Sequence, residues 1–175
     1  VAHGLWRGWY RTGELQFEET WQNGKLNGAQ THWFKNGQKD SEGVWVNGNK
    51  DQLWIRWDEQ GQKVSEAHWE DGVQHGTEIT LHKNGETKAR SQFNNGMLDG
   101  PYVVWFDNGT QKISGHFMDG EKSGIWKEWF LTGDMKSEHC YGDGQSVTWH
   151  RSGKKESEGG VKSGAEDGHW TYWNE

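Results

Sequence analysis

An all-β fold, a single antiparallel sheet built from tandem hairpins, is predicted by three observations on this 175-residue chain. Glycines recur every 24 residues, at Gly13, Gly37, Gly61, Gly85, Gly109 and Gly133. A second ladder of Asn-Gly or Asp-Gly turns keeps the same period, and aromatic residues keep constant offsets from both ladders. Periods of this length are typical of arrays in which each unit packs on its neighbours. We therefore expect an elongated, twisted sheet of about seven 24-residue hairpin repeats.

The array is expected to span residues 1–175 as one domain. Its predicted units are residues 4–27, 28–51, 52–75, 76–99, 100–123, 124–143 and 144–167, followed by a half-unit at 168–175. The spacing shortens to 20 residues between Gly133 and Gly153, because the return loop at 141–144 has lost four residues. Gln52 replaces glycine in a third ladder formed by Gly4, Gly28, Gly76, Gly100 and Gly124.

Composition limits the kind of core and the kind of partner. Only 30% of residues are hydrophobic, and 14 are Trp, so tryptophan is expected to replace aliphatic residues in the core. The formal charge of -7 opposes nucleic acids and anionic lipid surfaces and favours a basic partner. No stretch is long enough to span a membrane. The chain begins at Val1 and not at Met, so we expect a processed or trimmed N-terminus and favour an extracytoplasmic (periplasmic) location over a cytoplasmic one.

The loop that closes each hairpin is predicted to contain three residues. A two-residue type I′ turn needs positive φ at both central residues, which Thr12 and Thr132 resist. A three-residue loop needs positive φ only at its last residue, which is the repeated glycine. This loop places Phe34 opposite Gln38 and Trp33 opposite Lys39.

From this register we predict which residues share a face. Trp33 is expected to lie with Ser41, Gly43 and Trp45 on a packed face, because small residues leave room for the indole. The equivalent first-strand positions are Trp9, Trp57, Leu81, Trp105, Trp129, Trp149 and Trp173.

The opposite face is the predicted partner-binding surface. Its expected aromatic residues, which are the types found at interface hot spots, are Trp6, Tyr10, Phe34, Trp54, Tyr102, Phe106, Trp126, Phe130 and Trp170. A line of glutamates is expected beside them, namely Glu18, Glu42, Glu66, Glu138 and Glu158. Two interpretations of this line stay open: an acidic stripe that meets a cationic partner, or a solvated face whose glutamates pair with lysines such as Lys63 or Lys122.

Two segments resemble a known repeat. The runs GAQTHWFKNGQKDSEGVWVNG (28–48) and GPYVVWFDNGTQKISGHFMDG (100–120) are similar to the MORN repeat, in the variant common in bacterial proteins. This resemblance implies one hairpin per repeat and a recognition or scaffold role, because bacterial arrays of this variant include antitoxin and immunity partners of secreted toxins. Trp9-Tyr10 with Gly13 is also similar to choline-binding and glucan-binding repeats, but those repeats are shorter and lack the return seen at 23–28.

No catalytic, metal or cofactor site is predicted. The histidines occupy different offsets within their repeats, and convergence of His68, His75 and His82 is not expected. Cys140 and His139 are adjacent in a strand and point to opposite faces, so we expect a free, half-buried thiol and no nucleophile-base pair. Serine occurs without a nucleophile elbow, and glycine without a phosphate-binding loop.

These observations favour a non-enzymatic protein that binds another protein. The most specific hypothesis is an immunity or antitoxin protein that sterically blocks a toxin or effector with a basic or cleft-like surface. The alternative is a structural scaffold or envelope-associated protein that binds lipid or glycan through exposed aromatic residues.

Overall fold

Strands and tight turns make up the whole fold, which contains no helix and so no helix that could cross a membrane. The computed structural model describes residues 1–175. The first seven strands are β1 (Gly4–Trp9), β2 (Leu15–Gln22), β3 (Lys25–Trp33), β4 (Lys39–Val46), β5 (Asn49–Trp57), β6 (Lys63–Glu70) and β7 (Val73–Leu81). The others are β8 (Thr87–Asn94), β9 (Met97–Leu98), β10 (Gly100–Trp105), β11 (Gln111–Met118), β12 (Glu121–Trp129), β13 (Met135–Tyr141), β14 (Gly144–Trp149), β15 (Lys155–Lys162) and β16 (Ala165–Tyr172).

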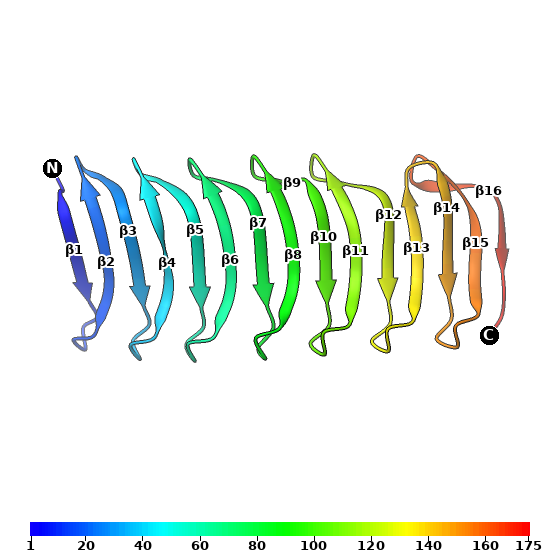
Figure 1. Cartoon of the computed structure of the whole chain (residues 1–175), viewed down its shortest axis with the longest axis horizontal. Helices are drawn as coiled ribbons and strands as arrows, with labels where there is room; N and C mark the ends of the chain where they lie inside the picture. Colours follow the sequence, from blue (N-terminus) through cyan, green and yellow to red (C-terminus); the bar gives the residue numbers. More distant parts are fainter. The chain divides into compact units, whose positions relative to one another are not determined.

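The strands form one open antiparallel sheet in which neighbours in sequence are hydrogen-bonded neighbours (Figure 1). Only the short strand β9 lies off this path, paired with β8. The predicted all-β class, the single open sheet and the hairpin repeats are therefore confirmed. Within the sheet the chain divides into two compact units, and each is described by itself below. Unit 1 comprises residues 1–85 and 93–96, and unit 2 comprises residues 86–92 and 97–175. The division of residues 1–175 into one array of repeats stays a prediction.

The three-residue hairpin loop is confirmed. Phe34 donates its N–H to the Gln38 carbonyl, while Gly37 donates back to the Phe34 carbonyl. Gly37 has a φ of 82°, in the left-handed region that glycine tolerates best. The same pair of hydrogen bonds recurs at Tyr10, Asp58, Phe106, Phe130 and His150.

The other end of each repeat is a two-residue turn with positive φ at both positions. Asn47 and Gly48 have φ values of 52° and 91°, the conformation of a type I′ turn. The Gly48 N–H donates to the carbonyl of Leu26, which lies in β3 two residues after the preceding turn, and the Gly72 N–H donates in the same way to the Lys50 carbonyl of β5. Each turn is thereby hydrogen-bonded to the strand that follows the preceding turn, which couples neighbouring repeats.

A β-bulge follows the loop in most hairpins. Lys39 pairs with Trp33 as predicted, but Ser41 pairs with His32, so Asp40 is an extra residue without a partner. The same irregularity lies at the loop end of five other hairpins. One extra residue sends every following side chain of the strand to the other face.

The bulge corrects the predicted faces. The prediction that Trp33 shares a face with Ser41, Gly43 and Trp45 is wrong, because those three residues follow the bulge and lie on the face of Gln30. Trp33 lies instead on the face of the glutamates. Indoles do pack beside small residues in this protein, but they belong to other tryptophans.

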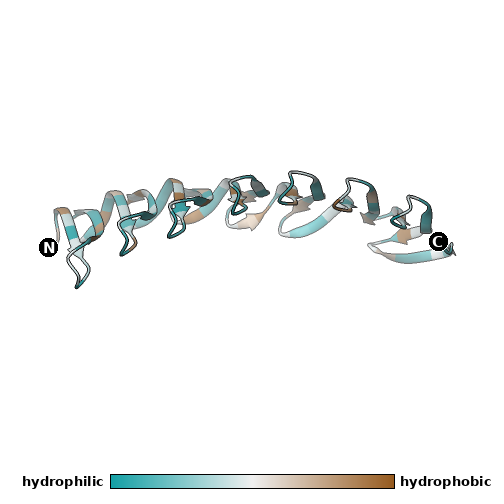
Figure 2. Ribbon diagram, turned by 90° about the horizontal axis from the view of Figure 1, so that it is seen from below, coloured by the Kyte–Doolittle hydropathy of each residue, from teal (hydrophilic) through white to brown (hydrophobic).

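Few side chains are buried in this thin sheet. The buried hydrophobic residues are Trp54 (7% exposed), Trp126 (5%), Cys140 and Val161. Hydrophobic residues appear as separate patches among hydrophilic ones (Figure 2). The core is therefore distributed along the sheet, with one buried indole in each unit.

Candidate partner-binding surface

The predicted glutamates and aromatic residues lie on opposite faces of the sheet. Glu66 pairs with Ile55, whereas Trp54, the next residue along β5, pairs with Ala67. We call the side with Glu18, Glu42, Glu66, Glu138 and Glu158 the glutamate face. We call the other side, with Trp54, Trp126 and Trp170, the indole face. The prediction that both sets form one surface is wrong, for the same reason as above: the bulge lies between the strand that carries the aromatics and the strand that carries the glutamates.

Each glutamate of the line has its own cation. In unit 1, the nitrogen–oxygen distances are 2.5 Å for Arg7–Glu18, 2.6 Å for Lys39–Glu42 and 3.0 Å for Lys63–Glu66. In unit 2, Lys127–Glu138 measures 3.1 Å and Lys155–Glu158 measures 2.6 Å. The interpretation that the glutamates pair with lysines is therefore supported, but the expected cross-strand pairing is wrong for Lys63, which binds Glu66 of its own strand. Lys122 pairs with none of them, and its ammonium lies over aromatic rings.

The indole face is built from tryptophans lying flat on glycines. A Cβ added to Gly43 would come 2.2 Å from the Trp54 ring, and one on Gly115 would come equally close to Trp126. These distances leave no room for any side chain larger than hydrogen. The prediction that indoles pack beside very small neighbours is thus correct, although Trp54 and Trp126 were assigned to the exposed face. Because both are buried, only a small part of each ring is left within reach of a partner.

The other predicted aromatics lie either within strands or beside the three-residue loops. Trp6 lies on the indole face and is half exposed, whereas Tyr102 packs against Phe117 and Trp126. Four more flank the three-residue loops and are half-buried, namely Tyr10, Phe34, Phe106 and Phe130. Cations lie over three of these rings, with Lys35 over Tyr10, Lys112 over Phe106 and Arg151 over Phe130. Binding of a partner by these residues stays a prediction.

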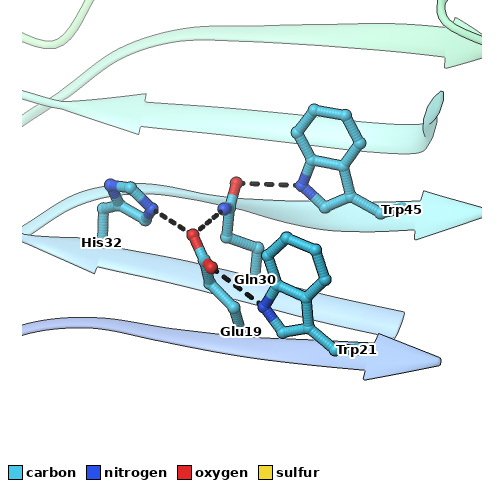
Figure 3. Close-up of polar contacts among 5 residues, drawn as sticks. All are labelled: Glu19, Trp21, Gln30, His32 and Trp45. Carbon is cyan, nitrogen blue, oxygen red and sulfur yellow. Dashed lines mark hydrogen bonds and ion pairs between the residues drawn. The ribbon is translucent and has the colours of Figure 1, made fainter. Parts of the chain in front are cut away.

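Glu19 and Gln30 form a polar cluster on the indole face of unit 1. Glu19 is 15% exposed, and its carboxylate accepts hydrogen bonds from Trp21 Nε1 and Gln30 Nε2, with His32 Nε2 3.4 Å away (Figure 3). Gln30 is buried and accepts the Trp45 Nε1–H through its own carbonyl. Every buried polar group of this cluster has a hydrogen-bond partner. The cluster therefore stabilises two repeat positions that carry a glycine and an indole in other repeats.

Beside Trp54, the indole face is hollowed into a groove of about 350 Å³. Its lining comes from β4, β5, β6 and β7 and consists of Ser41, Lys50, Trp54, Arg56, Ser65, Ala67, Trp69 and Glu78. The Lys50 ammonium lies 4.3 Å from the Trp54 ring centroid and 4.9 Å from that of Trp69. Burial lowers the pKa of Lys50, and the positive charge of Arg56 lowers that pKa further.

Sequence reasoning missed this groove. Lys50, Arg56 and Trp69 were not among the predicted site residues. One signal was available: Lys50 and Lys122 hold the same repeat position three units apart, each four residues before a tryptophan. The bulge, which brings Ser41 and Ser65 beside Arg56, could not be read from residue types.

The histidines and the cysteine support no metal or thiol chemistry. His68 and His75 line one pocket with Glu70 and Asp51, closer together than expected, but His82 is not part of it. No group of three or more His, Cys, Asp or Glu could hold a metal ion. Cys140 is a free thiol that is more buried than predicted, and it faces away from His139, as expected.

Comparison with known families gives one match. Residues 2–23 match the family model described as MORN repeat variant. This segment of the chain is similar to a MORN repeat. This confirms the resemblance inferred from the sequence, and the matched residues contain the β1–β2 hairpin and its three-residue loop. The later hairpins share the loop hydrogen bonds and the bulge of this MORN hairpin, which gives them the same geometry. No curated protein matches the chain.

Proposed function

We propose that this chain is a non-enzymatic repeat protein that binds another protein through the indole face of unit 1. The groove beside Trp54 is the observation that carries this proposal. Two indole rings and two cationic side chains surround a hollow large enough for a partner's side chain. Trp and Arg are the residue types most enriched at interface hot spots. The MORN repeat supports a binding role, because in repeat arrays the exposed surface is the part that recognises ligands.

Within this class, we propose an immunity or antitoxin protein that sterically blocks a toxin or effector. The support is the resemblance of its repeats to bacterial variant MORN arrays, which include such proteins. The net charge of -7 suits a target with a basic surface outside the groove. The five glutamates of the line do not add to the attraction of a basic target, because each of their carboxylates is already ion-paired.

A second candidate is a scaffold that binds glycan or lipid. The exposed rings of Trp6 and Trp9 on β1 favour it, since sugars stack on exposed indoles. Saturable changes in Trp fluorescence on titration with oligosaccharide or vesicles, lost in the Trp6→Ala/Trp9→Ala variant, would support this function.

Capture of the partner tests the main proposal. The tagged full chain is used to isolate proteins from the source cell, and they are identified by mass spectrometry. The Ser65→Trp variant fills the groove, while Glu66→Trp places the same side chain on the opposite face as a matched control. We expect a specific partner to be retained by the wild type and by Glu66→Trp, and to be lost from Ser65→Trp. A partner lost only from Glu66→Trp would contradict the assigned face. If the captured protein is toxic when expressed alone, co-expression of the chain should protect the cell.

A further inference from the structure

We propose that the groove beside Trp54 binds the carboxylate of an aspartate or glutamate side chain presented by the partner protein. This inference rests on the proposed function and names the chemistry of the group that enters the groove. Four observations carry it: the charges that line the groove, the hydrogen-bond donors around Arg56, the rings that hold Lys50, and the contrast with the equivalent position in unit 2.

The charged residues that line the groove carry a net charge of +1, which is opposite to the charge of one carboxylate. Lys50 and Arg56 contribute two positive charges and Glu78 one negative charge. Neither cation is in an ion pair, whereas Lys39 and Lys63 on the opposite face each bind a glutamate. The remaining single positive charge suits one carboxylate, and Glu78 would repel a doubly charged anion such as phosphate.

Three hydrogen-bonding side chains of the groove are neighbours on one face of the sheet. In the strand register, Arg56 lies between Ser41 of β4 and Ser65 of β6, on the same face. A guanidinium flanked by two hydroxyls is a suitable donor set for a carboxylate, because the guanidinium can bind both oxygens and each hydroxyl can rotate to donate.

The indoles position the second cation. Lys50 is held between the Trp54 and Trp69 rings by cation–π contacts, so its flexible side chain is already ordered at the groove. Its pKa is lowered by burial and by Arg56, which means that its charge lacks a compensating anion. A carboxylate placed between the two cations would compensate both.

The equivalent position in unit 2 keeps the rings but has lost the anion site. Lys122 lies 4.3 Å from the Trp126 ring centroid and also donates a hydrogen bond to the Tyr141 hydroxyl. Glu128 stands where unit 1 has Arg56, and it pairs with Lys136 at 2.8 Å. The chain therefore contains its own control, with a lysine over an indole in both units and a glutamate in unit 2 where unit 1 has the arginine.

The experiment titrates the full chain with an acetylated, amidated Gly-Glu-Gly peptide, using Gly-Gln-Gly as the uncharged match and inorganic phosphate as a competing anion. Binding is followed by NMR at the Trp54 indole N–H, which donates to the Val44 carbonyl. We expect saturable shifts with the glutamate peptide and at least about tenfold weaker binding of the glutamine peptide, because a charge-assisted hydrogen bond is lost. Arg56→Glu should abolish binding, while Lys122→Met should leave it unchanged. Should Arg56→Glu fail to fold, Lys50→Met replaces it.

Equal binding of the two peptides, tighter binding of phosphate than of the glutamate peptide, or no saturable shift would each overturn the inference. The partner-capture experiment separates this failure from that of the proposed function. If Ser65→Trp no longer binds the partner and Arg56→Glu binds it fully, the docking surface is supported and the carboxylate inference is rejected. Loss from both variants supports both statements, and retention by both rejects both.

Discussion

Trp54 in unit 1 and Trp126 in unit 2 hold the same repeat position, but their surroundings differ: Trp54 borders the groove, whereas Trp126 lies in a cluster of rings. Both indoles lie on a glycine and donate Nε1–H to a backbone carbonyl of the preceding strand. Around Trp126, the rings of Tyr102, Phe117 and Tyr141 form an aromatic cluster. Their counterparts around Trp54 are the amide of Gln30 and the rings of Trp45 and Trp69, with only Trp45 in ring contact.

Small side chains open the groove of unit 1. Ala67 stands where unit 2 has His139, and Ser41 stands where unit 2 has Ile113. His139 packs edge-on against Tyr141 and so occupies space that stays empty beside Ala67. The comparison teaches that the same repeat position can be closed by large neighbours in one unit and left beside an open groove by small neighbours in another.

Removing the indole from each unit should have the largest effect and should separate the two roles. We expect Trp126→Ala to lower the free energy of unfolding by about 3–5 kcal/mol, since a buried ring with three aromatic neighbours is lost. Trp54→Ala should fall at the low end of that range, because Trp54 has one ring neighbour, Trp45, where Trp126 has three. Urea unfolding followed by far-UV circular dichroism measures both values. A larger loss for Trp54→Ala would contradict the comparison.

Adding one methyl group under the indole tests the glycine–tryptophan fit. Gly43→Ala should destabilise the chain by about 1–3 kcal/mol, because the new Cβ would lie 2.2 Å from the Trp54 ring and overpack the face. The control is the same substitution in a Trp54→Ala background, where the methyl group should cost far less. Equal costs in the two backgrounds, measured as a double-mutant cycle, would show that the ring and the glycine do not interact.

The contribution of Glu19 to stability should depend on the hydrogen-bond donors around it and not on its side-chain volume. Glu19→Gln replaces one carboxylate oxygen, an acceptor, with an NH2 donor that faces another donor, the Trp21 indole or the Gln30 amide, so we expect a loss of about 1–3 kcal/mol of unfolding free energy. The swap Glu19→Gln/Gln30→Glu restores a donor opposite an acceptor and should recover most of that loss. If the swap is as unstable as the single variant, the hydrogen bonds seen in Figure 3 do not stabilise this position.

The smallest expected effect concerns backbone strain at Gln52. This residue has a φ of 59°, at a position where the neighbouring repeats carry Gly28 and Gly76. Gln52→Gly should raise the melting temperature and stabilise the chain by about 1 kcal/mol, since the left-handed conformation costs glycine much less. The matched control, Gly76→Gln, should lower the melting temperature. A decrease for Gln52→Gly would indicate that the glutamine side chain has a structural role.

The periodicity of glycine predicted the loops well, because a positive φ is a local requirement that residue type reveals. Gly37 needed the left-handed region for a three-residue loop, and Asn47-Gly48 needed it twice for a type I′ turn. The candidate site was predicted less well. Aromatic residues were identified by type, but Trp54 and Trp126 were placed on the wrong face, and the groove residues Lys50 and Arg56 were overlooked.

The sequence by itself determined the repeat, the hairpins, the open sheet and the need for an indole beside a very small residue. Only the tertiary structure decided which indole meets which glycine, because a single unpaired residue such as Asp40 exchanges the two faces and leaves no mark in composition or spacing. It also decided which charges are free. Glutamates that look like an acidic stripe in sequence each meet a cation across or along the strands, whereas Lys50 and Arg56 meet on the other face without one.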